Sequence, residues 1–181
     1  GMYTDAHQTE HQHQQWLDAL DRRRQQREQE EQARADRSLS IPKRGRLYRQ
    51  ILNQLPLAEI DAQDLLARLE RVGVTGDEAI AAIQASGFKS VERWQSISAI
   101  AAPLPGLLDP RTLNTQPGYL CPTRDLQGRI TGAQIRLRHA EGGRYRWLTS
   151  ATKRHKQGAT PHLASGELPL SVFRGTNPTH T

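Results

Sequence analysis

The feature of the sequence that most constrains the fold is the alternation of apolar and polar residues at positions 129–139. Successive side chains of a strand point to opposite faces, so this alternation gives one apolar face and one polar face. Two further strand-like runs lie at 119–125 and 144–150, and turns at 126–128 and 141–143 contain glycine. The pattern predicts an antiparallel meander of three strands.

The polar positions of this predicted sheet are rich in arginine. Residues 124–156 contain nine Lys or Arg residues and only two acids, Asp125 and Glu141. Like charges side by side on a sheet repel one another unless something negative neutralises them. Guanidinium groups match phosphate oxygens and also stack on bases. We therefore expect a nucleic-acid-binding surface, with a solvated basic face as the alternative. The expected contact residues are Arg124, Arg129, Arg136, Arg138, Arg144, Arg146, Lys153, Arg154 and Lys156.

The net charge of +6 is concentrated in the same part of the chain. Residues 111–181 hold eleven Lys or Arg residues against three acids, whereas the first 110 residues carry a slight acidic excess. A local basic excess on a folded segment indicates a polyanionic partner, bound with an affinity that falls steeply with salt. Tyr145 and Trp147 could stack on bases if they are exposed, or could belong to the core.

Residues 1–40 predict a charged arm that is either helical or disordered. After Trp16, Leu17 and Leu20 the segment has almost no large apolar residue until Leu39, and charges of both signs recur at helical spacing. A sustained coiled-coil seam is absent from it. We expect a solvated helix that packs, if at all, through its first turns.

Residues 41–100 predict a helical subdomain. The expected helices are 47–55, a run from Glu59 or Asp61 to Gly73, and a run from Thr75 to Gly87. Pro56 would end the first of them. The second and third helices suggest a helix-turn-helix, but the third begins with Asp77 and Glu78 and carries no basic residue. A helix that reads DNA must face phosphates, so we disfavour that function.

The remaining segments complete an α+β organisation: an N-terminal helical segment followed by a small antiparallel sheet. Residues 101–117 contain four prolines and predict a connector. Residues 118–175 form the expected basic β subdomain, and residues 176–181 a disordered tail. Residues 90–97 are ambiguous.

No cofactor or metal site is expected. His7 and His11 have the spacing of a helical metal pair but lack a third ligand. The single cysteine, Cys121, reads as a small buried residue rather than a catalytic thiol. The sequence shows neither a membrane span nor the apolar core of a signal peptide, so a cytoplasmic protein is expected.

Several motifs in order resemble a known family. PTRDLQGRITGAQIR, GRYRWLTS and GATPHL resemble the lobe that precedes the toprim lobe in the catalytic core of DnaG-type bacterial primases. LYRQILNQLPL, GFKSVERWQ, PGYLCPTRD and SGELPLSVFRG resemble, more narrowly, cyanobacterial plasmid replication proteins of the primase–helicase kind. This resemblance covers roughly residues 45–175. The positions that match the primase pattern are Pro122, Arg124, Asp125, Gly128, Arg129, Arg136, Arg144 and Tyr145.

The resemblance implies a lobe that holds single-stranded template beside a toprim active site. Arg124, Arg129, Arg136 and Arg144 would then contact the nucleic acid. Gln134 and Ile135 stand where replicative primases have a glycine pair, and neither the toprim acids nor a phosphate-binding helicase loop is present.

We therefore expect no enzymatic activity from this chain alone. The expected partners are single-stranded DNA or an RNA–DNA hybrid, and toprim and helicase domains of the same protein. A protein-interaction module that docks through its N-terminal helix, without binding DNA, is the alternative. An independent hydrolase lacks any catalytic constellation.

Overall fold

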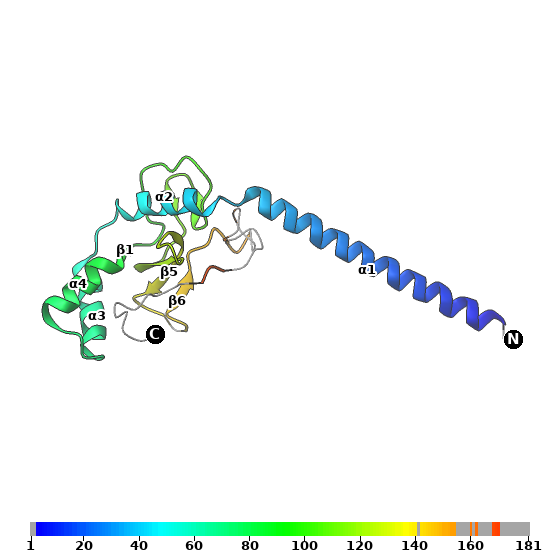
Figure 1. The fold of residues 1–181 in the computed structure, drawn as a ribbon, viewed down its shortest axis with the longest axis horizontal. Coiled ribbons are helices and arrows are strands. Elements are labelled where there is room, and N and C mark those ends of the chain that lie inside the picture. The colour runs from blue at the N-terminus through cyan, green and yellow to red at the C-terminus, as the bar shows by residue number, and fades with distance from the viewer. Residues whose placement is uncertain (1–2, 141, 155–159, 161, 163–167, 171–181) are drawn as a thin grey trace.

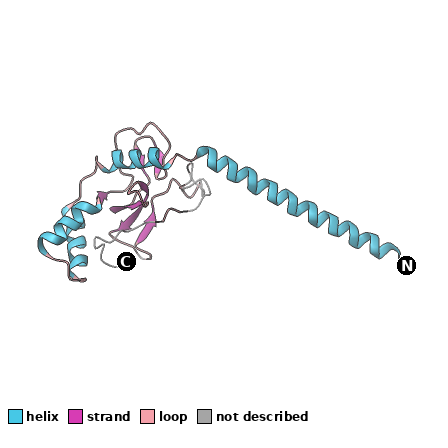
Figure 2. Cartoon of the chain, in the orientation of Figure 1, coloured by secondary structure: helices cyan, strands magenta, loops and turns pink. Residues whose placement is uncertain are grey.

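The computed structural model describes residues 3–140, 142–154, 160, 162 and 168–170. Helices precede an antiparallel sheet, so the predicted α+β class is confirmed (Figure 2). The helices are α1 (Tyr3–Arg37), α2 (Ile41–Leu52), α3 (Glu59–Glu70) and α4 (Gly76–Ser86). The strands are β1 (Lys89–Val91), β2 (Leu107–Asp109), β3 (Thr112–Leu113), β4 (Gly118–Arg124), β5 (Ile130–Leu137) and β6 (Tyr145–Trp147).

The N-terminal arm is helical. Helix α1 extends away from the rest of the protein, with the N-terminus at its far end (Figure 1). Pairs of side chains four residues apart support it, such as the ion pair between Arg24 and Glu28. Trp16, Leu17 and Leu20, the residues through which packing was expected, are exposed.

The main sheet has four antiparallel strands in the order β1-β4-β5-β6. The predicted meander is present as β4, β5 and β6, with Leu120 opposite Ile135 and Arg136 opposite Tyr145. Sequence analysis missed β1, because its three residues are too few to show an alternating pattern.

Helix α2 packs on the apolar face of the sheet and forms the core with it. Tyr48, Ile51 and Leu52 of α2 are buried in the same cluster as Leu120 and Ile135. The helix begins before the predicted position 47, since a proline in its first turn is compatible with helix geometry. One hydrophobic core therefore joins the segments expected to form separate helical and β subdomains.

The segment 101–117 is also part of this core and not only a connector. Leu104 and Leu113 are fully buried, and β2 pairs with β3 inside the segment. Gly106 lies so close to Leu148 that a Cβ there would be 2.3 Å from the leucine Cγ. The prolines set the path of a packed loop.

Two buried basic side chains lie beside the start of β5. Arg44 donates to the carbonyl oxygen of Thr131 at 3.3 Å, and His162 packs edge-on against Trp147. Burial and the nearby Arg44 charge lower the pKa of His162 to about 4. In the folded protein His162 therefore stays neutral at pH values at which the same histidine is already protonated in the unfolded chain.

This histidine predicts a pH-dependent stability. The free energy of unfolding should be constant above about pH 6.5, the usual pKa of histidine, and should fall as the pH decreases toward 4. Urea denaturation at several pH values measures this fall in the free energy of unfolding. The window between about pH 6.5 and 5 is the informative one, because few carboxylates titrate there. His162→Phe should remove the decline in that window. An unchanged decline in the variant would contradict the prediction.

Candidate nucleic-acid interface

The first predicted contact residue that the structure reassigns is Arg138. Its guanidinium donates to both carboxylate oxygens of Asp61 in α3, at 2.9 and 2.7 Å, and to Glu92 at 2.5 Å. Asp61 is only 2% exposed and also accepts a hydrogen bond from Ser90 at 2.5 Å. These hydrogen bonds raise the pKa of Arg138 above its usual range. Arg138 ties the sheet to α3, and its prediction as a nucleic-acid contact is corrected.

Arg136 is reassigned in the same way. Its side chain is 3% exposed and lies 3.5 Å from Asp64 of α3. Its guanidinium also lies over the rings of Tyr119 and Tyr145, at 5.7 and 5.9 Å from their centroids. Asp64 accepts further hydrogen bonds from Arg68 and from the hydroxyl of Tyr119. A phosphate cannot reach Arg136 in this arrangement.

The arginines of the sheet therefore do not form one surface. Arg136 and Arg138 lie on the face covered by α3, whose carboxylates neutralise them. In β6, Arg146 lies opposite Ile135, so it belongs to the other face of the sheet. Their separation on two faces corrects the expectation of a single arginine surface.

Asp125, Gly128 and Arg129 of the primase-like motif form the turn between β4 and β5. One carboxylate oxygen of Asp125 accepts the backbone N–H groups of Gln127 and Arg129, and the other accepts the Arg129 side chain at 2.7 Å. Gly128 has a φ of +74°, which favours glycine. Arg124 donates to the Gly128 carbonyl at 3.3 Å. Since the turn itself uses these residues, Arg124 and Arg129 are less available to a ligand than was expected.

Four of the nine predicted cations are exposed and make no ion pair or side-chain hydrogen bond with a described residue. They are Arg144, Arg146, Lys153 and Arg154. Lys156 lies outside the described residues. Tyr145, beside the first two, is 52% exposed, whereas Trp147 is half-buried against His162. Strand β6 and the segment that follows it therefore carry the free positive charge of the predicted set.

The strand pairing brings four chain segments to one end of the sheet. Strand β1 ends at Val91, which lies opposite Gly118 at the start of β4. Gly118 in turn lies opposite Leu137 at the end of β5, and β6 begins one position away at Tyr145. The residues just beyond these strand ends therefore lie side by side in the order of the strands, with those after β1 and those before β6 at opposite edges of the sheet.

We call the residues beyond these strand ends, together with Arg146 of β6, the sheet-end surface. Its members are Arg93, Trp94, Gln116, His139, Arg144 and Arg146. Gln116, His139 and Arg146 line a hollow of about 430 Å³. Glu92, which precedes Arg93, is paired with Arg138, and Glu141, between His139 and Arg144 in the sequence, lies outside the described residues. Sequence analysis missed Arg93 and Trp94 because residues 90–97 showed no clear period.

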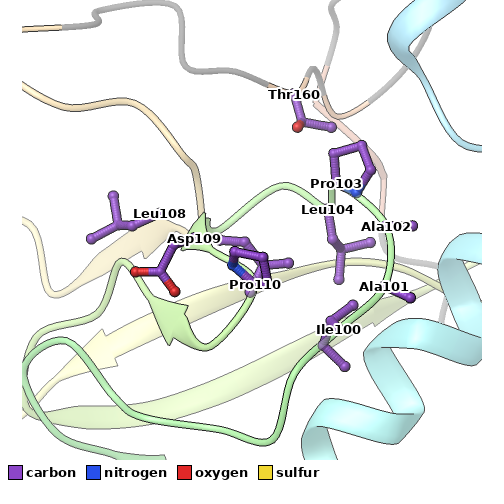
Figure 3. A pocket seen from close by; sticks show the side chains of 10 residues that line it. Ile100, Ala101, Ala102, Pro103, Leu104, Leu108, Asp109, Pro110 and Thr160 are labelled. Carbon is purple, nitrogen blue, oxygen red and sulfur yellow. The ribbon is translucent and has the colours of Figure 1, made fainter.

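A second hollow is apolar and lies on the loop before β2 (Figure 3). Its volume is about 320 Å³, and Asp109 is the only charged residue among the described residues that line it. An acidic group repels phosphate, so this hollow does not fit a nucleic acid backbone.

Reactive thiolates and metal ligands are the other chemical groups of interest in the described part of the chain. Burial raises the pKa of Cys121 to about 12, so thiolate is scarce at neutral pH. Among the described residues, no group of three or more His, Cys, Asp or Glu side chains could hold a metal ion. In the same part of the chain, no helix combines the length and the apolar character that crossing a membrane requires.

In comparisons with known proteins, no family model, curated protein or solved structure matches the chain.

Proposed function

We propose that the protein binds single-stranded nucleic acid and acts as a non-catalytic lobe of a plasmid replication protein of the primase–helicase kind. The observation that carries this proposal is that Arg144, Arg146, Lys153 and Arg154 are exposed and make no ion pair with any described residue. The primase-like order of motifs supports the replication role.

The free cations are placed where a flexible strand can reach them. β6 is the last strand in the order of the main sheet, so within the described part of the chain one side of it has no neighbouring strand. Arg146 also lines the 430 Å³ hollow, which can accommodate part of a nucleotide. Single strands bind well to such grooves because their backbone follows the charges while the bases remain free to stack.

A salt titration tests the proposal. Binding of an end-labelled oligothymidylate, followed by fluorescence anisotropy, should weaken as salt rises. The variant Arg144→Ala/Arg146→Ala should bind roughly tenfold more weakly, and the slope of log K against log salt should become shallower by about 1.4. Both changes follow from the loss of two phosphate contacts.

The matched control is Arg22→Ala/Arg23→Ala, which removes the same charge from the exposed helix α1. This control should retain the wild-type affinity. Absence of binding by the wild-type protein at low salt, or equal losses in both double variants, would overturn the proposal.

A protein-interaction role remains the second candidate, because of the exposed apolar residues of α1. Trp16, Leu17 and Leu20 lie exposed within two turns of a helix that is otherwise polar. The salt titration separates the two candidate functions. Nucleic-acid binding that is absent or insensitive to salt favours a protein-interaction role for α1.

A further inference from the structure

We infer that Trp94, supported by Arg93, is a stacking site for a base of the bound single strand; this inference rests on the proposed function. Trp94 lies in the turn after β1 and its side chain is 54% exposed. The guanidinium carbon of Arg93 lies 4.3 Å from the centroid of its ring. Arg93 thus covers one face of the indole, and a base stacks on the opposite face.

The backbone holds Trp94 in an unfavourable conformation. Its φ of +51° is in the left-handed region, and no other described non-glycine residue has a positive φ. A bulky side chain is unfavourable there, and such strain persists only where the surroundings fix it. A small residue or glycine would suit this turn better, so folding alone does not account for the tryptophan.

Hydrogen bonds between the buried Thr115 and residues 92–95 fix the turn. The N–H of Trp94 donates to the Thr115 carbonyl at 3.1 Å, and the N–H of Gln95 donates to the Thr115 hydroxyl oxygen at 3.0 Å. That hydroxyl donates to the carbonyl of Glu92 at 2.6 Å. The indole is therefore presented to solvent from a rigid support, which lowers the entropic cost of binding a base.

The position of Trp94 fits the path of a strand that contacts β6. Thr115, which binds the turn, is followed directly by Gln116, and Gln116 lines the hollow together with His139 and Arg146. The strand order thus places Trp94 at one edge of the sheet-end surface and the β6 cations at the other, with Gln116 and His139 between them. β1 and β6 are three strand spacings apart, about 14 Å, so a nucleic acid strand whose phosphates contact Arg144 and Arg146 can cross the sheet end and place a base further along its length on Trp94.

The test compares Trp94→Gly with the wild-type protein, using oligothymidylate and a matched oligonucleotide in which every site is abasic. On oligothymidylate, Trp94→Gly should bind about 5- to 100-fold more weakly, as expected for the loss of one stacked base. On the abasic strand the two proteins should bind equally, because the phosphates remain and the bases are gone. The melting temperature should not fall, since glycine relieves the positive φ.

Trp16→Gly is the control, because Trp16 is equally exposed at 57% but lies on α1; its affinity should match that of wild type. If Trp94→Gly lowers the melting temperature, Trp94→Asn replaces it, because asparagine tolerates this backbone region. Unchanged binding of oligothymidylate by the folded Trp94 variant overturns the inference. The proposed function still stands in that case if the β6 double variant loses affinity, and it falls if the wild-type protein does not bind.

Discussion

Asp61→Asn should lower the free energy of unfolding by about 3–5 kcal/mol, because it leaves the Arg138 charge without its main partner in a largely buried site. Asp61 accepts two hydrogen bonds from Arg138 and one from Ser90, whose oxygen in turn accepts the N–H of Ala58. The carboxylate therefore joins α3, β1 and the end of β5. Urea denaturation at neutral pH measures the loss.

Glu92→Gln is the matched control for this prediction. Glu92 also binds Arg138, but it is 63% exposed, so its loss should cost no more than about 1 kcal/mol. Arg138→Met in the Asp61→Asn background should recover part of the stability, since it removes the unpaired charge. Equal costs for Asp61→Asn and Glu92→Gln would contradict the buried pair.

Gly118→Ala should lower the free energy of unfolding by at least about 3 kcal/mol, because the strands leave no room for a methyl group. A Cβ at position 118 would lie 2.0 Å from the carbonyl oxygen of Arg136 and 3.1 Å from the Cα of Leu137. Both atoms belong to the backbone of β5, which can move only if the β4–β5 pairing shifts. The same denaturation experiment measures this loss.

Gly142→Ala provides the comparison, because a Cβ there would meet no atom within 4 Å. That variant should remain within about 0.5 kcal/mol of the wild-type stability. A Gly118→Ala protein as stable as Gly142→Ala would show that β4 and β5 are further apart at this end than the structure has them.

The meander could be predicted because β4 and β5 are long enough for the alternation of apolar and polar residues to be recognised in the sequence. β4 and β5 span seven and eight residues, and their apolar positions face the core as the pattern indicates. β1 and β6 have only three residues each. The turn ahead of β6 contains a glycine pair that marks its start, whereas β1 has no comparable signal.

The role of Arg136 and Arg138 could not be read from the alternation, which separates two faces but does not say what covers each. The signal that points to their partners lies in α3. Asp61 and Asp64 share a helix face with the buried Leu65. Acids beside a core residue indicate a buried ion pair, but the sequence does not say which arginines supply it.

The candidate site was predicted in part. Arg144 and Arg146 were among the nine basic residues predicted as contacts, and the structure leaves both of them exposed. Trp94 was missed because neither its positive φ nor the support from Thr115 can be recognised in a sequence. Both depend on contacts between residues about twenty positions apart.

Helix α1 also sets the distance between its N-terminal end and the rest of the protein. At 1.5 Å per residue its 35 residues span about 52 Å, and only three residues separate it from α2. A macromolecule that engages the far end of this rod is held tens of ångströms from the sheet while remaining tethered to it. When one macromolecule binds the N-terminal end of α1 and another binds the sheet, the helix keeps the two within about its own length of each other. Each then has a raised local concentration near the other.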